Sequence, residues 1–104
     1  MEQVCLIVDD KDQQHTFKAQ IQDILKKEGH NVEIIFINTT SPELLNEEQN
    51  IDKDKLKACI KSKIEGKHID VVASDFDLSD DVVNGLDVIE IIRSIREKVP
   101  IILY

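Results

Sequence analysis

Four short apolar runs constrain the fold of this chain more than any other feature of its sequence. They occupy residues 4–8 (VCLIV), 32–37 (VEIIFI), 69–74 (IDVVAS) and 101–104 (IILY). A short run that is apolar at nearly every position is typical of a strand buried on both faces, and parallel sheets are built from such strands. We therefore predict four parallel strands within a single domain that covers residues 1–104.

Three segments between these runs carry apolar residues at the spacing of one helix face. They span residues 13–28, 53–65 and 86–98. Their inward positions are Phe17, Ile21, Ile24 and Leu25, then Leu56, Cys59, Ile60 and Ile64, and finally Val88, Ile91, Ile92 and Ile95. That period predicts amphipathic helices. Strands and helices that alternate in this way indicate an α/β fold whose parallel sheet is joined by right-handed crossovers.

The connection between the second and third runs, residues 39–68, is longer than one crossover helix requires. Its first half is polar and acidic, and Ser41 is suited to capping a short helix that begins at Pro42. We predict that this helix and a loop occupy residues 43–52, ahead of the helix at 53–65. We treat this part of the chain as an insertion between the second and third strands.

The charge balance argues against several classes of partner. The net charge is −8, and a phosphate backbone repels such a chain, so we expect no nucleic-acid binding. Anionic membrane surfaces are disfavoured for the same reason, and no apolar run is long enough to span a bilayer. Cys5 and Cys59 stand apart inside apolar patterns, which predicts free thiols in a reducing compartment. We therefore expect a cytoplasmic protein.

Carboxylates follow two of the predicted strands directly. Asp9 and Asp10 end the first run, and Asp75 ends the third. Ligands of open α/β sheets bind beyond the carboxyl ends of the strands, so these three side chains converge if the two strands are neighbours. Confined carboxylates stay ionised only beside a cation, or else one of them takes up a proton. Mg²⁺ suits the site because it binds a few carboxylates together with water and phosphate oxygens.

Each of these residues also has a simpler interpretation. Asp9 and Asp10 precede a predicted helix and could do no more than cap it. An aspartate such as Asp75 is common at the end of a strand, and Asp80 and Asp81 fit a solvated loop. The combination at the ends of two adjacent strands favours a site, in which a carboxylate left free to attack could accept a phosphoryl group.

Two segments together resemble the receiver domain of a two-component response regulator. They are VCLIVDD and IDVVASDFDLSDDVVNGLDVIEIIRSIREKVPIILY. In that family an apolar strand ends in Asp, and a loop, a Gly, an amphipathic helix and a Pro precede the next strand. Here these positions are Asp75, Gly85 and Pro100. The resemblance covers nearly all of the chain except about residues 39–68. It implies a flavodoxin-like doubly wound parallel sheet, incomplete at the C-terminus.

The resemblance also implies a role for each acidic residue. Asp75 stands where the family accepts the phosphoryl group, and Asp9 and Asp10 stand where it holds Mg²⁺. Asp77 stands where a backbone carbonyl binds the metal, and its side chain adds negative charge there. The implied function is two-component signal transduction: a histidine kinase or phosphotransfer protein forms an aspartyl phosphate, which biases an unknown output partner.

The chain departs from the family pattern in its loop and at its end. Ser79 replaces a proline often found in the loop, and the family's Ser or Thr would fall just past Tyr104. The family's fourth helix, fifth strand with its Lys, and fifth helix would also fall past Tyr104. In the family the Ser or Thr and the Lys bind the phosphoryl oxygens. The resemblance therefore implies either a fragment of a longer chain or a shortened receiver. The run at residues 101–104 then becomes an uncovered edge, which tends to pair with another chain. We expect the chain to form a homodimer, to exchange elements with a neighbour or to aggregate, with this strand or the face of the first helix at the contact.

Two other functions stay open. A receiver-like domain that no longer switches would act through its surfaces as a protein-binding module. The segment Asp75-Phe76-Asp77 also resembles the nucleophile motif of haloacid-dehalogenase-type phosphatases. That motif normally lies on an early strand, and it leaves Asp9 and Asp10 unexplained. Phosphate incorporation from a small-molecule donor distinguishes a receiver from a binding module, and turnover of a phosphate monoester would indicate the phosphatase.

Overall fold

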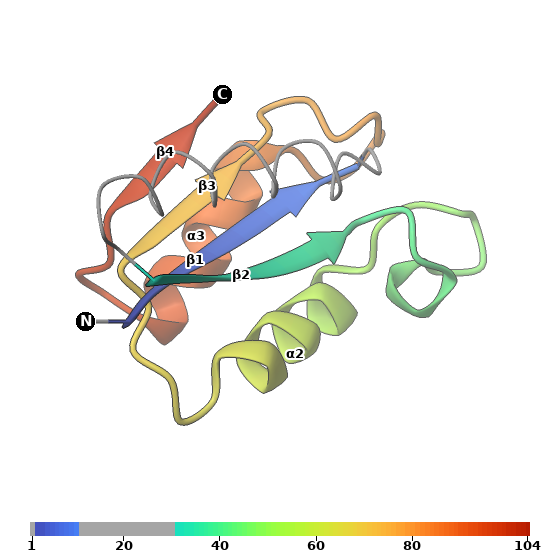
Figure 1. The fold of residues 1–104 in the computed structure, drawn as a ribbon. Coiled ribbons are helices and arrows are strands. Elements are labelled where there is room, and N and C mark those ends of the chain that lie inside the picture. Colours follow the sequence, from blue (N-terminus) through green and yellow to red (C-terminus); the bar gives the residue numbers. More distant parts are fainter. Residues whose placement is uncertain (1, 11–30) are drawn as a thin grey trace.

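A four-stranded parallel sheet lies at the centre of the protein (Figure 1). The computed structural model describes residues 2–10 and 31–104, so the helix expected over residues 13–28 lies outside the described part. Every pairing is parallel, and the spatial order is β2-β1-β3-β4. The strands are β1 (Glu2–Asp9), β2 (Asn31–Asn38), β3 (Val71–Ser74) and β4 (Ile101–Leu103). The predicted α/β parallel-sheet architecture is confirmed.

The register aligns the carboxyl ends of the strands along one edge of the sheet. Asp9 pairs with Asn38 of β2, and Val8 pairs with Ser74 of β3. Ser74 pairs in turn with Leu103 of β4. Because parallel strands all point the same way, the segments that follow them emerge at the same edge. β1 lies between β2 and β3, so the segments that follow β1 and β3 are neighbours.

The main hydrophobic core lies between the sheet and two helices on one of its faces (Figure 1). These helices are α2 (Lys53–Ile64) and α3 (Gly85–Ile95). Alternation along β1 directs Val4, Leu6 and Val8 into this core. The helices contribute Leu56, Ile60, Ile64, Val88, Ile91 and Ile92, as predicted. Each fully buried aliphatic side chain stabilises the fold by roughly 1.5–3 kcal/mol.

Side-chain caps set where the two helices begin. The carboxylate of Asp52 accepts backbone hydrogen bonds at the start of α2, and the amide oxygen of Asn84 does so at the start of α3. Asp87 reaches back to the N–H of Asn84 at 2.9 Å and completes a capping box. These bonds satisfy backbone donors that have no partner within the helix.

Both ends of α3 differ from the predicted range of 86–98. The helix begins at Gly85 and ends at Ile95. Arg96 leaves the helical conformation, and its guanidinium donates to the carbonyl oxygens of Lys67 at 2.9 Å and Ile64 at 3.1 Å. Ile64 is the last residue of α2, where backbone acceptors lack helical partners, and Lys67 lies three residues beyond it. The contact joins the end of α3 to the end of α2 and the turn that follows it.

The connection from β2 to α2 contains less helix than predicted. A single 3-10 turn, η1 (Pro42–Leu44), begins at Pro42 and stands in place of the short helix expected before a loop within residues 43–52. Ser41 occupies the N-cap position but makes no capping bond through its side chain. Leu45 and Ile51 form an antiparallel bridge, and Ile51 is buried in the main core. Burial of side chains, rather than helix propensity, therefore decides the path of the chain here.

The strand β3 begins two residues later than predicted, at Val71 rather than Ile69. Asp70 lies just before it and binds the backbone of Val4 twice. The side-chain Oδ2 of Asp70 accepts the N–H of Val4 at 2.7 Å, and the N–H of Asp70 donates to the carbonyl of Val4 at 2.9 Å. A carboxylate oxygen thus stands in for a strand carbonyl at the amino end of the sheet.

Both cysteines are free thiols, as predicted. Burial raises the pKa of Cys5 and of Cys59 above the ordinary value for a thiol. These thiols therefore behave as packing groups.

Among the helices of the described residues, none is long and apolar enough to cross a bilayer.

The strand β4 forms one edge of the described sheet. Ile102 at its centre is 58% exposed. An edge strand presents unpaired backbone groups to its surroundings, and another chain can pair with them. The position of β4 at the edge of the sheet agrees with the sequence analysis. Self-association through this strand stays a prediction. The other expected contact, the face of the first helix, lies outside the described residues.

The amino end of α3 leaves no room for a side chain at Gly85. The N–H of Gly85 donates to the carbonyl of Phe76 at 2.8 Å. A Cβ added to Gly85 would lie 2.6 Å from a methyl carbon of Leu103. It would also lie 2.7 Å from the carbonyl oxygen of Asp75 and 2.8 Å from the Cα of Phe76. Since real Cβ atoms do not approach other atoms so closely, either α3 or the segment after β3 would have to move.

We predict that Gly85→Ala lowers the free energy of unfolding by about 1–3 kcal/mol, the usual range for overpacking. Urea unfolding followed by circular dichroism measures the difference. Gly66→Asn is the control, because no atom lies within 4 Å of the added Cβ and Asn tolerates the φ of +72° at that position. Unfolding of Gly85→Ala at the same urea concentration as the parent would contradict the close approach.

Candidate metal centre

Three carboxylates meet where β1 and β3 end. Asp9 is the last residue of β1, Asp10 follows it, and Asp75 follows β3. Each offers one oxygen, and these oxygens lie within 4.8 Å of one another. Asp9 is 2% exposed and Asp10 is 9% exposed, whereas Asp75 is partly exposed. The convergence predicted from the strand order is observed.

The pairing of β1 with β3 continues past the last residue of β3 and places Asp75 beside Asp9. The N–H of Asp75 donates to the carbonyl of Val8 at 3.0 Å. This bond extends the parallel ladder by one residue, so the acidic ends of both strands share one level of the sheet. The site is thus positioned by regular backbone pairing, which is more rigid than a loop.

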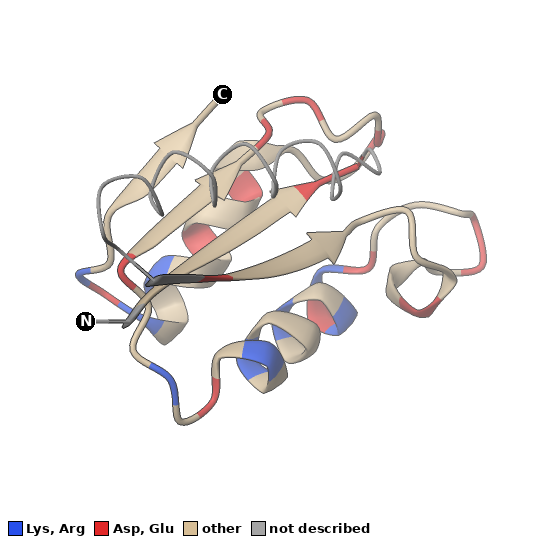
Figure 2. Cartoon of the chain, viewed as in Figure 1, with Lys and Arg blue, Asp and Glu red and all other residues tan. Residues whose placement is uncertain are grey.

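Charge is distributed unevenly around this edge (Figure 2). Acidic residues lie at the end of β1 and in the loop that follows β3. The described Lys and Arg residues lie on α2 and toward the amino ends of the strands. The local field at the carboxyl edge is therefore negative, and it attracts cations.

The three carboxylates also alter one another's ionisation. Burial raises the pKa of Asp75 above its ordinary value, and the negative charges of Asp9 and Asp10 raise it further. The N–H of Asp77, 3.2 Å from Oδ1 of Asp75, acts in the opposite direction by stabilising the ionised form. A contact with the Asp9 carboxyl group also raises the pKa of Asp75, because it favours the protonated form. A cation beside the cluster would instead favour the ionised form of Asp75.

Asp10 provides an independent indication of a ligand. Its Oδ1 is buried and has no hydrogen-bond partner in the part of the chain that the structure describes. The buried hydroxyl oxygen of Thr39 is in the same situation, and the N–H of Thr39 donates to the carbonyl of Asp9 at 3.0 Å. Buried polar atoms without partners are unfavourable and rare. Oxygen donors of this kind match Mg²⁺, so the residues present fit the cation that the sequence suggested.

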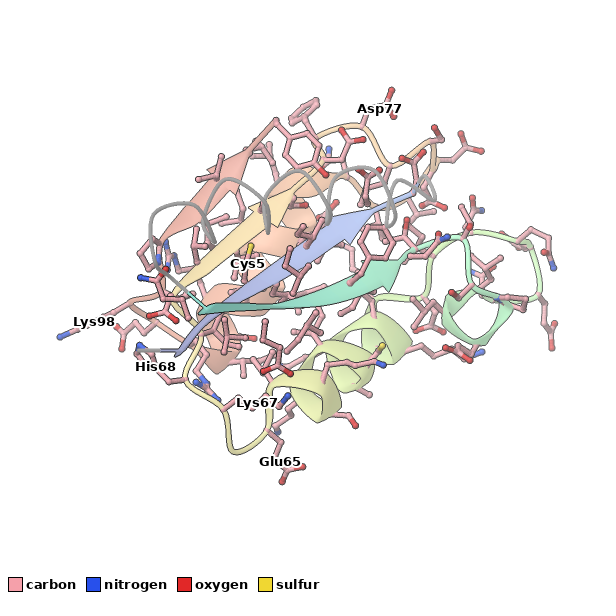
Figure 3. All side chains as sticks on the ribbon, viewed as in Figure 1. Cys5, Glu65, Lys67, His68, Asp77 and Lys98 are labelled. Atoms are coloured by element: carbon pink, nitrogen blue, oxygen red, sulfur yellow. The ribbon has the colours of Figure 1, made fainter. Side chains whose placement is uncertain are left out.

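Asp77 lies apart from the three carboxylates. Its side chain is exposed and points away from the sheet (Figure 3). Its Oδ1 accepts the N–H of Ser79 at 2.9 Å, and Ser79 has a φ of +53°. A turn directly after β3 thus directs the Asp77 carboxylate outward. The metal-binding role expected for its backbone carbonyl stays a prediction.

A tyrosine joins the cluster, and the sequence analysis did not anticipate it. The hydroxyl of Tyr104 donates to Oδ2 of Asp9 at 2.6 Å. Burial raises the pKa of this phenol, and the hydrogen bond to Asp9 raises it further. The two residues are 95 positions apart, so no local motif marks the contact. The available signal was that the chain's single tyrosine directly follows an apolar run.

Asp80 is not the solvated loop residue that its sequence context predicted. Its Oδ1 accepts the N–H of Ile51 at 2.8 Å. Its Oδ2 accepts the N–H groups of Val82 at 2.9 Å and Val83 at 2.8 Å. One carboxylate therefore joins the β2–α2 connection to the loop that follows β3. The neighbouring Asp81 is exposed, as expected.

The chain matches no family model, no curated protein and no solved structure. Its chemistry therefore has to be inferred from the carboxyl edge of the sheet. That edge holds two buried carboxylates, suited to binding a cation, and a third that is partly exposed and able to meet a substrate.

We predict that Asp80→Asn lowers the free energy of unfolding by about 1–3 kcal/mol, because an amide keeps one acceptor oxygen and turns its NH₂ toward backbone donors. Urea unfolding measures this loss, and the amide of Ile51 should exchange its hydrogen faster in an NMR experiment. Asp81→Asn is the matched control and should stay within about 0.5 kcal/mol of the parent. If the two variants unfold alike, the hydrogen bonds of Asp80 contribute nothing to stability.

A second prediction concerns the pH dependence of Asp75. Because its pKa is raised on folding, its contribution to stability is present at acidic pH and is lost as the pH rises through the folded-state pKa. Asp75→Asn should therefore raise the melting temperature of the metal-free protein at neutral pH, and the gain should vanish in acid. Thermal melts in chelator across pH measure this. Asp81→Asn controls for the loss of one charge, and an equal gain at every pH would contradict the prediction.

Proposed function

We propose that this protein is a phosphoacceptor domain that takes a phosphoryl group onto Asp75, with Mg²⁺ held by Asp9 and Asp10. The observation that carries the proposal is the convergence of three carboxylate oxygens within 4.8 Å at the carboxyl edge of a parallel sheet. The buried Oδ1 of Asp10, which has no partner among the described residues, supports the presence of a cation. The resemblance of two sequence segments to receiver domains supports the same function.

The different burial of the three carboxylates suggests that they have different roles. Asp9 and Asp10 are buried and would hold the cation, whereas Asp75 is partly exposed and would meet the phosphoryl donor. When bound, Mg²⁺ neutralises charge on the phosphoryl oxygens and on the carboxylates. The N–H of Asp77 orients the Asp75 carboxylate through its bond to Oδ1.

In the transfer itself, an oxygen of ionised Asp75 forms a bond to phosphorus while the bond from phosphorus to the leaving group breaks. The electron pair of that bond departs with the leaving group, which is the imidazole nitrogen of a phosphohistidine or the acetate of acetyl phosphate. The product is an aspartyl phosphate. The raised pKa of Asp75 disfavours its ionised form in the absence of a cation, so cation binding and acceptor reactivity are coupled.

The surface around Asp75 suits a protein partner. Phe76, which follows Asp75, is 47% exposed, and Leu86 at the start of α3 is 52% exposed. The N–H of Gly85, the residue before Leu86, donates to the carbonyl of Phe76. A histidine kinase or phosphotransfer protein is the donor that fits this proposal. The exposed edge of β4 suits a second copy of this chain. The net charge of −8 opposes nucleic acid as a partner.

The other two functions have less support. A non-switching binding module would keep the carboxylate cluster but would not become phosphorylated. In a phosphatase of the haloacid-dehalogenase type, Asp77 would act beside Asp75, but its carboxylate is exposed and bonded within its own turn. The metal cluster does not include it.

A two-stage experiment tests the proposal, beginning with the cation. Isothermal titration calorimetry with Mg²⁺ should show weak binding, since a site that retains several waters has few protein ligands. Asp10→Asn should abolish this binding because it removes a charge and replaces an oxygen donor. Asp81→Asn, an exposed carboxylate of the same region, should bind like the parent. Equal affinity in Asp10→Asn and the parent would refute the shared site.

The second stage adds acetyl phosphate and Mg²⁺. Mass spectrometry of peptides should locate a phosphoryl group on Asp75, and Asp75→Asn should carry none. Label on Asp77, or label that persists in Asp75→Asn, would contradict the assignment of the acceptor. Mg²⁺ binding without label would favour the binding module. Repeated release of phosphate from a monoester would favour the phosphatase.

A further inference from the structure

Tyr104 extends β4 by one residue and stands next to Asp75. Its N–H donates to the carbonyl of Ser74 at 3.0 Å, and its carbonyl accepts the N–H of Phe76 at 2.8 Å. These two bonds flank Asp75, so Tyr104 is its neighbour in the parallel ladder. The backbone of Tyr104 is therefore held by regular pairing at the level of the carboxylate cluster.

The side chain of Tyr104 extends past Asp75 to the strand β1. Its hydroxyl binds Oδ2 of Asp9 at 2.6 Å, and Asp9 lies on β1, the strand beyond β3. Adjacent strands are about 4.8 Å apart, so the ring of Tyr104 extends across the position of Asp75. Tyr104 is 44% exposed, whereas Asp9, which its hydroxyl binds, is 2% exposed. The ring therefore spans from the surface to the most buried acid of the cluster.

We propose that Tyr104 is a positioning residue of the metal centre: its hydroxyl holds the Asp9 carboxylate in the orientation that binds the cation. The inference rests on the proposed Mg²⁺ site and adds a residue to it from β4. Carboxylates that bind metals are commonly held in place by hydrogen bonds from a second layer of groups, and loss of such a group weakens metal binding. The phenol hydroxyl is a donor of this kind, and its bond to a carboxylate is charge-assisted and short.

The position of Tyr104 separates this role from a purely structural one. Its ring is partly exposed and belongs to neither hydrophobic cluster of the described residues. Removal of the hydroxyl alone leaves the ring and the backbone pairing with Ser74 and Phe76 in place. We therefore expect the loss to affect the cation far more than the fold.

Tyr104→Phe tests the proposal. Isothermal titration calorimetry should show Mg²⁺ affinity weakened by about 10- to 100-fold, the range found for such supporting groups. The melting temperature in chelator should stay close to that of the parent. Ile102→Val is the matched control: it trims an exposed side chain on the same side of the same strand, and it should leave the affinity unchanged.

Tyrosine fluorescence provides a second measurement on the unmodified protein. The chain has one tyrosine and no tryptophan, so the tyrosine emission reports on the surroundings of Tyr104 alone. Mg²⁺ draws charge from Asp9 and weakens the acceptor of the phenol hydrogen bond, so the emission should change and saturate at the midpoint found by calorimetry. In Asp10→Asn the change should disappear.

The possible outcomes are distinct. A parent that binds Mg²⁺ and a Tyr104→Phe variant of equal affinity would overturn the positioning role and leave the proposed function intact. Tighter binding by the variant would also overturn it, because the hydroxyl would then compete with the cation. Calorimetric binding with unchanged tyrosine emission would place the cation away from Asp9. A parent that binds no Mg²⁺ would refute the proposed function, and with it this inference.

Discussion

The parallel pairing of β1 between β2 and β3 is the interaction on which the rest of this structure depends. Hydrogen bonds along both sides of β1 satisfy its backbone inside the protein. Its side chains alternate, so Leu6 and Val8 enter the main core while Ile7 faces the opposite side of the sheet. Because all the strands point the same way, the same pairing brings Asp9 beside Asp75. The core and the candidate site are both consequences of one buried strand.

Carboxylates that converge repel one another, and several groups offset this repulsion. The N–H of Asp77 donates to Asp75, and the hydroxyl of Tyr104 donates to Asp9. Burial and the charges of Asp9 and Asp10 raise the pKa of Asp75, which favours uptake of a proton when no cation is bound. These contacts stabilise individual oxygens but leave Oδ1 of Asp10 buried without a partner among the described residues. A divalent cation would satisfy that oxygen and neutralise the remaining charge.

Asp75 is held by separate parts of the chain. Gly85 at the start of α3 lies against its carbonyl, and Tyr104 after β4 pairs with the backbone on both sides of it. Asp80 in the loop after β3 is bonded to Ile51 in the β2–α2 connection. Through Gly85 and Tyr104, Asp75 lies against both α3 and the end of β4.

The sequence by itself determined the α/β class, the parallel strands and the three carboxylates at their ends, because apolar periodicity and the polar residues that follow it are local properties of the chain. Only the tertiary structure decided that α3 ends at Ile95 and that Asp80 and Tyr104 are parts of hydrogen-bonded networks. Arg96, whose contacts accompany the end of α3, binds carbonyls 29 and 32 residues away, and Tyr104 binds Asp9 across 95 residues. A buried polar group takes its partner from whichever segment folding places beside it, and no local pattern encodes that choice.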